Sequence, residues 1–241
     1  MELYGTGLNA WNQLRFGCNE ADAEPDDLHT FTCVLADDDI RHVRPYLSWT
    51  TGHLALLPPH NNPPPHPPLP PSTWPTPTPP THLTSHATGF ALLHPPSTVL
   101  TTSDLRFSSC LGRPPSSLSP STPHPVPDLL DLPTGPVVKI ASSSSGYVLA
   151  ALTAGGDLYA WGHAGRASAA GLGGLGVTGE VTPVVVEEHD IADVGVGEGH
   201  VVVLTTTGEV FGIGSNRNGQ LGLGEGMEGA EEWTRVGGGR W

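Results

Sequence analysis

Positive charge is scarce in this sequence. Its 241 residues include 10 Lys and Arg against 24 Asp and Glu, which gives a formal net charge of −14 at pH 7. Nucleic-acid backbones and anionic membrane surfaces are bound chiefly through Lys and Arg. The shortage therefore argues against direct nucleic-acid binding and against docking on a membrane. The acidic excess fits a solvated surface or a basic partner.

Cysteines and long apolar runs are also scarce. The three cysteines, Cys18, Cys33 and Cys110, form no Cys-x-x-Cys pair, and their odd number does not suggest a disulfide framework. We therefore expect an intracellular, reducing setting. No run of about 18 apolar residues exists, and the first residues, MELYGTGLNAW, lack the apolar segment of a signal peptide. We expect a nuclear or cytoplasmic protein that is not secreted and does not span a membrane.

Glycine and proline, by contrast, are abundant, with 31 and 26 residues. Both are unfavourable in helix interiors and common in turns and at strand ends, so a mostly helical fold is not expected. Proline is concentrated in residues 58–85 and, together with serine, in residues 114–136. A polyproline-like backbone cannot form a central strand, so these two segments are predicted to be linkers or surface insertions.

The remainder of the chain contains an internal repeat. Residues 210–224 read VFGIGSNRNGQLGLG and residues 3–17 read LYGTGLNAWNQLRFG, with six identities in an ungapped alignment. Residues 152–162, LTAGGDLYAWG, align with residues 204–214, LTTTGEVFGIG, at an offset of 52 (204 − 152). A spacing of about 50 residues is typical of propeller blades.

Each repeat is predicted to contain a β-hairpin. Residues 201–204, VVVL, form a run typical of a strand buried on both faces, and Gly208 marks the turn into the returning strand. Gly212 and Gly214 carry no Cβ atom, which predicts close approach of neighbouring segments. One blade cannot bury its own apolar face, so several blades are expected to stack.

Residues 193–224 resemble a repeat of the regulator of chromosome condensation family. The resemblance consists of a Gly-x-x-His element, a Gly-acidic hairpin turn, the Gly of the family's Trp-Gly pair and a Gly-Gln-Leu-Gly ending. In this sequence the four elements are Gly197 to His200, Gly208-Glu209, Ile213-Gly214 and Gly219 to Gly222. The Trp is replaced here but present one repeat earlier, in Trp161-Gly162. The match is fair in residues 137–165 and 3–17 and weak elsewhere.

The resemblance implies an all-β fold: a partial or reduced β-propeller of about four to five blades with Pro-rich insertions, related to the family's seven-bladed ring. A piece of a longer chain, a truncated gene and a reduced ring remain alternatives. The predicted parts are an N-terminal blade end with one degenerate repeat, a Pro-rich linker, a second degenerate repeat, a Ser/Pro-rich linker, and two recognisable repeats with the start of a third at residues 233–236. They cover residues 1–57, 58–85, 86–113, 114–136 and 137–241.

Several motifs that resemble cofactor-binding, catalytic or metal-binding sites are better explained as turns or strand residues. Residues 171–176 and 224–229 fit Gly-x-Gly-x-x-Gly, but a dinucleotide site needs a following helix, which VTGEVTP after Gly176 does not provide. His200 is expected to be a structural strand residue. The histidines near the Pro-rich segments have no paired metal-ligand spacing. These are His60, His66, His82, His86, His94 and His124.

Three further segments are also assigned no site. Residues 37–39, three aspartates, lack the spaced ligands of a calcium loop, and residues 142–145, four serines, lack the Gly-x-Ser-x-Gly frame of a nucleophile. Residues 67–70, PPLP, could be read by a proline-recognition domain. No catalytic, cofactor-binding or metal-binding residue, and no cofactor, is predicted.

The sequence thus predicts a non-enzymatic interaction scaffold that binds a protein partner through propeller loops. As alternatives, the family resemblance implies guanine nucleotide exchange on a small GTPase or association with chromatin proteins. An enzyme with its site in a propeller channel is a further alternative that no cluster of acid, base or metal-binding residues supports.

Overall fold

The structure is a computed structural model of the chain. It describes residues 2–7, 28–36, 43–47, 52–56, 80–114, 120, 123–143, 145–187, 189–224 and 226–237. The chain divides into two compact units, Met1–Pro79 and Pro80–Trp241. The predicted features at residues 37–39, 58–79 and 115–119 lie outside the described residues.

The second unit contains three four-stranded antiparallel sheets in which each strand pairs with the next along the chain. The first sheet comprises β5 (His82–His86), β6 (Gly89–His94), β7 (Thr98–Thr101) and β8 (His124–Pro125). The second comprises β9 (Val137–Ser142), β10 (Val148–Thr153), β11 (Leu158–Gly162) and β12 (Thr182–Val184). The third comprises β13 (Ile191–Val196), β14 (His200–Thr205), β15 (Val210–Ser215) and β16 (Gly229–Arg235).

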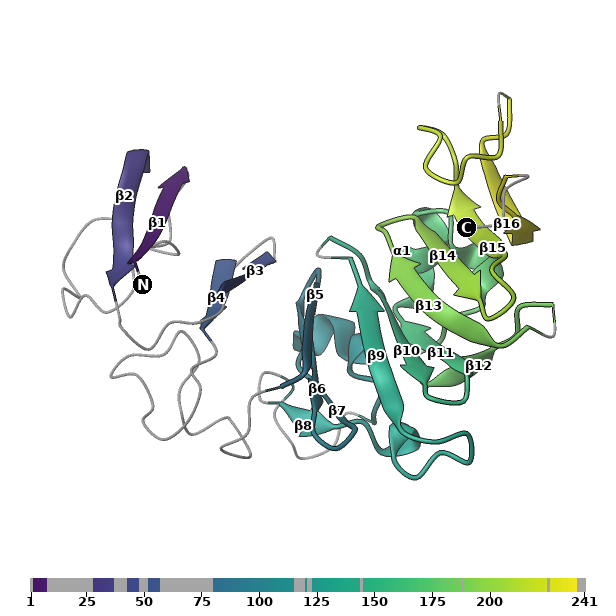
Figure 1. Ribbon diagram of the computed structural model, residues 1–241, viewed down its shortest axis with the longest axis horizontal. Coiled ribbons are helices and arrows are strands. Elements are labelled where there is room, and N and C mark those ends of the chain that lie inside the picture. The colour runs from purple at the N-terminus through teal and green to yellow at the C-terminus, as the bar shows by residue number, and fades with distance from the viewer. Residues whose placement is uncertain are drawn as a thin grey trace. The chain divides into compact units, whose positions relative to one another are not determined.

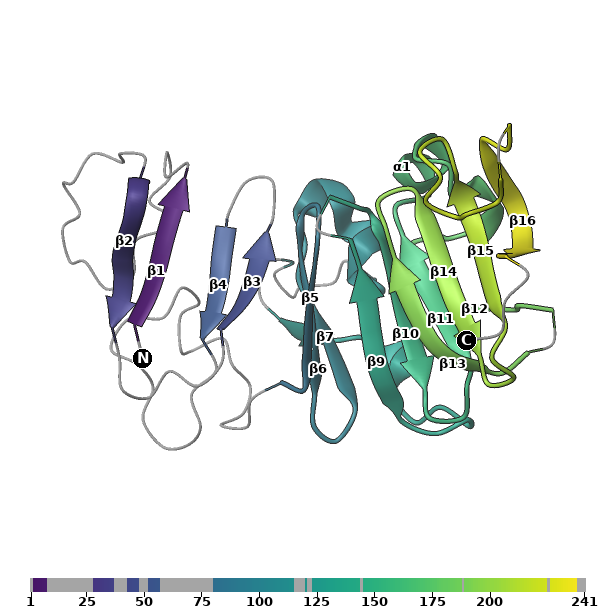
Figure 2. The ribbon, with the colours of Figure 1, turned by 45° about the horizontal axis from the view of Figure 1, so that its top comes forward.

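The three sheets follow one another as blades do, with β9 beside β5 on one side and β13 on the other (Figures 1 and 2). The first strand of each blade is therefore the innermost one. Short helices occupy the connections: η2 (Leu105–Leu111), η3 (Pro127–Leu129), α1 (Ala164–Ala169) and η4 (Gly173–Leu175). In the part of the chain that the structure describes, no helix is long and apolar enough to cross a membrane. The expected all-β, partial propeller-type architecture is confirmed.

Two apolar layers hold the blades together, and β10 contributes to both. Leu149 and Ala151 face the first blade, where they pack with Ala91, Leu93 and Val99. The alternate β10 residues face the third blade, as strand geometry requires. The strand buried on both faces is thus β10. In β14, by contrast, Val201 and Val203 are buried while Val202 is only half-buried, which corrects the expectation for residues 201–204.

The first unit contains two hairpins. Strand β1 (Glu2–Gly7) pairs with β2 (Leu28–Ala36), and β3 (Val43–Leu47) pairs with β4 (Gly52–Leu56). Gly5 faces Thr32 with a register shift before Gly7, just as Gly212 faces Thr234 with a shift before Gly214. The sequence match between residues 3–17 and 210–224 therefore reflects the same irregular pairing of the two outer blade strands.

The second predicted linker contributes to the first blade. Residues 114–136 contain β8 and η3, and they bury Val126 and Leu129 in the core. Pro125 fits in β8 because β8 is the outermost strand of its sheet. The backbone N–H group that proline lacks is therefore not needed to pair with a further strand. The first predicted linker, 58–85, also ends too late, since β5 begins at His82.

The Gly-x-x-His element is reversed in the first blade. In the third blade Gly197 at the end of β13 lies opposite His200 at the start of β14, and its amide donates to the His200 carbonyl at 2.8 Å. At the matching point of the first blade, His86 ends β5 and pairs with Gly89 of β6. A side chain at Gly89 would overlap the Thr102 carbonyl oxygen. Glycine and histidine have thus exchanged places, and the close neighbour of the glycine differs: Gly197 lies against the His200 imidazole, whereas Gly89 lies against the Thr102 backbone.

The segment predicted to open a further repeat closes the third blade. Residues 233–236 include the end of β16, which pairs with β15, and the Val236 amide donates to the Val210 carbonyl at 2.8 Å. Strand β12 closes the second blade in the same way. A sequence repeat is therefore offset by one strand from a structural blade.

Candidate interaction site

The connections between first and second strands, and between third and fourth strands, lie at one end of the three blades. We call the described parts of these connections the loop face; they are residues 87–88, 102–114, 120, 123, 143, 145–147, 163–181, 197–199, 216–224 and 226–228. Antiparallel order places them together, while the second-to-third strand turns lie at the other end. The connections on the loop face are longer than the second-to-third strand turns at the other end of the blades (Figure 2).

Contacts across blade boundaries join these loops into one surface. The Ala87 amide donates to the Gly146 carbonyl at 2.8 Å, which links the first and second blades. The Ser145 hydroxyl donates to Glu198 Oε2 at 3.1 Å, which links the second and third. A side chain at Gly199 would overlap the Ala170 carbonyl oxygen, so these loops also approach at backbone distance.

An aromatic and cationic cluster lies where the loops of the first two blades meet. The Phe107 ring centroid is 5.0 Å from that of Tyr147 and 5.3 Å from that of His163. The exposed Arg166 guanidinium lies over both rings, 5.4 Å from the Tyr147 centroid and 5.8 Å from the Phe107 centroid. His163 also caps α1, since its Nδ1 accepts from the Arg166 amide at 3.2 Å. We call Phe107, Tyr147, His163 and Arg166 the aromatic cluster.

An exposed apolar side chain lies close to the aromatic cluster in sequence. Leu105 begins η2 and is 73% exposed. Its neighbour Arg106 is held by Asp104, with a 2.7 Å distance between Arg106 Nη2 and Asp104 Oδ2. Arg, Tyr and Phe are enriched at interface centres, where rigid rings and planar guanidinium groups bury area at low entropic cost. This part of the loop face therefore has the chemistry of a protein interface.

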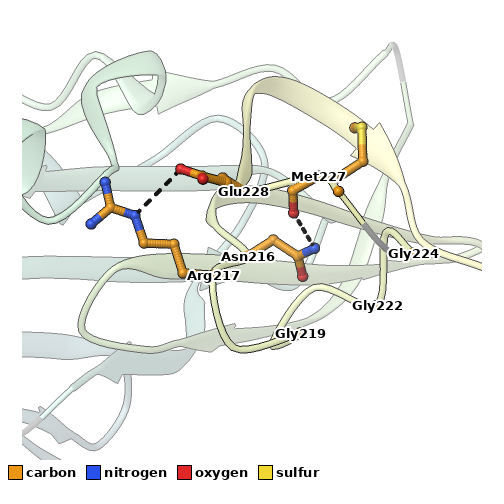
Figure 3. Close-up of a pocket in the computed structure, with 8 residues that line it drawn as sticks. Asn216, Arg217, Gly219, Gly222, Gly224, Met227 and Glu228 are labelled. Carbon is orange, nitrogen blue, oxygen red and sulfur yellow. Dashed lines mark hydrogen bonds and ion pairs between the residues drawn. The ribbon is translucent and has the colours of Figure 1, made fainter.

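The loop of the third blade is glycine-rich and lines an open pocket of about 540 Å³ (Figure 3). Asn216 is buried and holds the loop closed: its Nδ2 donates to the Met227 carbonyl at 2.7 Å, and its Oδ1 accepts from the Leu221 amide at 2.9 Å. Arg217 and Glu228 face each other across the pocket with 3.9 Å between Arg217 Nε and Glu228 Oε2. Both side chains are largely exposed, so this ion pair is weak and can open to a partner.

The sequence motifs set aside earlier take structural places. Residues 171–176 contain η4 and pack on the third blade: a side chain at Gly174 would overlap the Glu231 carbonyl oxygen. The described His82, His86, His94 and His124 all belong to strands of the first blade. Among described residues no group of His, Cys, Asp and Glu is arranged to hold a metal ion.

Two buried groups show how burial suppresses reactivity in this unit. Burial raises the pKa of the Cys110 thiol to about 12, so it stays protonated at neutral pH. Burial lowers the pKa of His86 to about 4, partly opposed by the hydrogen bond between its Nε2 and the Thr102 carbonyl at 3.0 Å. Burial also lowers the pKa of His200. These groups are packed as structural elements.

The aromatic cluster was missed by sequence reasoning. Its members come from three different loops, and none of them matches a motif. A usable signal exists, since Tyr147 directly precedes β10 and His163 directly follows β11, the two strand ends that meet on the loop face. Aromatic residues at these paired ends could have been singled out once the strands were assigned.

Comparison with known proteins agrees with this architecture. Residues 191–220, which contain β13 to β15, match the model of the regulator of chromosome condensation (RCC1) repeat. Human WBSCR16 is similar in structure, with a TM-score of 0.51 and 18% identity over 65% of this chain and 37% of that chain. Prp20p from Saccharomyces cerevisiae has a TM-score of 0.48 and 15% identity over 66% of this chain and 38% of that chain. The chain thus spans well under half of the length of these solved structures.

The blades and their order define a β-propeller protein. Within it, residues 191–220 of the third blade are similar to one repeat of the regulator of chromosome condensation family.

Proposed function

We propose that the chain is an intracellular, non-enzymatic interaction scaffold. It binds a protein partner through the loop face. The observation that carries the proposal is the aromatic cluster, in which an exposed guanidinium lies on two half-buried rings at the junction of two blades. Loops on a rigid sheet scaffold are free to vary in sequence while their ends stay fixed. Such an arrangement suits recognition, because a partner can bury the rings and pair the guanidinium.

The chain offers a matched pair of variants to test this proposal. Leu105 on the loop face and Val185, which follows β12 near the other end of the blades, are both apolar and both 73% exposed. We expect Leu105→Ser and Arg166→Ala to lose the partner, with affinity falling about tenfold or more per residue. Val185→Ser should retain it. All three substitutions are at exposed positions and should leave the unfolding midpoint nearly unchanged.

Quantitative affinity purification with the wild type and the three variants, followed by calorimetric titration of the purified partner, gives the readout. A partner that binds the wild type and Val185→Ser but not Leu105→Ser supports the loop face. Equal binding by all variants would place the interface elsewhere. Recovery of no partner by the wild type would contradict the scaffold proposal itself.

Guanine nucleotide exchange and chromatin association remain the alternatives that the family resemblance implies. The net charge of −14 makes direct contact with nucleosomal DNA unfavourable. Exchange is distinguished by a direct assay, in which the purified chain is added to small GTPases loaded with a fluorescent guanine nucleotide. Accelerated release that is lost in Arg166→Ala would favour exchange through the loop face over passive scaffolding.

A further inference from the structure

One face of the third blade has no neighbouring blade within the second unit. The second blade lies between two others, since β9 is beside β5 and β13, whereas the third blade is the last of the three (Figures 1 and 2). In β14, Val201 and Val203 belong to the apolar layer shared with the second blade. The residues that alternate with them therefore point to the opposite side. We call this side the free face; on β14 and β15 it comprises Val202, Leu204, Val210 and Gly212.

The second blade shows that the repeat builds this face to be covered. At the repeat offset of 52 residues, Val202 corresponds to Ala150 and Leu204 to Leu152. Ala150 and Leu152 are each 3% exposed, because the third blade packs over them. Val202 and Leu204 are only half-buried and belong to neither apolar layer. Burying the remaining apolar surface of these two side chains is favourable, so the face has a use for a cover.

The free face is uneven, because glycines lie on both sides of Val202. Val202 pairs with Gly195 of β13 and with Gly212 of β15. A Cβ atom at Gly212 would lie 2.7 Å from Leu221 Cδ2 and 3.1 Å from Val236 Cγ2, so these two side chains already cover Gly212. A Cβ atom at Gly195 would meet nothing within 4 Å. Open space therefore lies beside Val202 on the β13 side, and an aromatic ring is the kind of group that packs over a glycine of a sheet.

The chain leaves β16 on the free face itself. Val236 lies over Gly212 on this face, and Gly237 has a φ of +67°, which turns the chain. Residues 238–241, Gly-Gly-Arg-Trp, follow directly. Four residues span up to about 14 Å when extended. Two strand spacings, from β16 to β14, amount to about 10 Å. Trp241 can therefore reach Val202 and Leu204.

We propose that Trp241 covers the free face of its own chain by packing over Val202 and Leu204. An indole ring buries about 150–250 Å² and is tethered beside the face, so its effective concentration there is high. A second copy is a weaker candidate. Two free faces of four strands each would bury on the order of 800 Å² in total, less than the roughly 1,000 Å² of a specific interface. The proposal goes beyond the binding of a partner by the loop face and does not depend on it.

Nuclear magnetic resonance of the full-length, isotope-labelled protein tests the proposal. We expect nuclear Overhauser contacts between the Trp241 indole protons and the methyl groups of Val202 and Leu204. The ring should shift these methyl resonances upfield, and the shift should be lost in Trp241→Ala. The methyl resonances of Val203, which faces the second blade, should stay in place. Arg240→Ala, a matched change in the same segment that keeps the ring, should retain the wild-type shifts.

The contacts in the wild type do not depend on any variant folding. Their absence would overturn the proposal, and so would Val202 and Leu204 methyl shifts that are the same in the wild type and in Trp241→Ala. Methyl resonances that move with protein concentration, together with a dimer in sedimentation equilibrium, would show that a second copy covers the face instead of Trp241.

Discussion

Replacing Gly214 by alanine should destabilise the third blade far more than the same change at two other glycines. Gly214 has a φ of +110°, which disfavours any residue with a Cβ atom. A Cβ atom there would also overlap the Gly199 carbonyl oxygen and lie 2.8 Å from His200 Cα and 2.9 Å from Leu172 Cδ2. The first two contacts are with backbone of the paired strand, which cannot move without breaking the ladder.

The expected magnitude follows from two contributions. Backbone strain at positive φ costs about 1–3 kcal/mol, and overpacking against backbone costs about 1–3 kcal/mol. Gly214→Ala should therefore lower the free energy of unfolding by about 3–5 kcal/mol. Gly219 has a φ of +75° but open space where its Cβ atom would lie, so Gly219→Ala should cost only about 1 kcal/mol. Gly195 has neither feature, and Gly195→Ala should change stability by less than about 0.5 kcal/mol.

Urea unfolding followed by tryptophan fluorescence and far-ultraviolet circular dichroism measures all three variants on one scale. The order Gly214→Ala, Gly219→Ala, Gly195→Ala, from most to least destabilising, is the expected result. If Gly214→Ala were no worse than Gly219→Ala, the close approach of the β14 backbone to β15 would not be a constraint on the blade. The physical explanation of this repeat glycine would then be wrong.

Three further predictions concern buried polar groups. His86 has a pKa of about 4 in the folded protein against an ordinary value of 6.5, so the unfolded state binds the proton more readily. Stability should therefore fall by up to about 3 kcal/mol as the pH drops from 7 to 4, and the urea midpoint of His86→Gln should depend less on pH over that range. Trp161→Phe removes the 3.1 Å hydrogen bond from Nε1 to the Cys110 carbonyl and part of a fully buried ring, and should cost about 2–4 kcal/mol in urea unfolding. Cys110, with a pKa of about 12, should react with a thiol reagent only after denaturation, as peptide mapping would show.

Sequence reasoning succeeded where a contact is tied to one residue type at one position. The third blade was predicted because Gly208, Gly214 and Gly219 hold left-handed backbone that other residues avoid. The N-terminal match was predicted because Gly5 and Gly7 occupy the same irregular register as Gly212 and Gly214. In both cases almost only glycine satisfies the backbone constraint. The constraint can therefore be recognised from a glycine at a fixed position of the sequence.

The first blade was predicted only as a degenerate repeat at residues 86–113, because its glycine and histidine are arranged differently from those of the third blade. With His86 on β5 and Gly89 on β6, glycine and histidine are on strands opposite to those of Gly197 and His200. An alignment compares positions, so an exchange between strands removes the match although both residue types are present at the start of the blade. The same blade hides its fourth strand in a segment rich in serine and proline, where only Val126 and Leu129 indicate a core.

The candidate site was harder to predict than the fold, and the blades show why. Each loop between the third and fourth strands contains a buried leucine followed by glycine, in Leu111-Gly112, Leu172-Gly173 and Leu221-Gly222. These leucines are at most 1% exposed, so each loop is anchored to its blade at one point. Between that anchor and the preceding strand, one loop forms η2, another α1, and the third a turn over residues 216–220. Packing fixes the anchor and leaves the intervening residues free. The residues that can recognise a partner are therefore those that the repeat does not specify, and they become visible only when the loops of adjacent blades are brought together.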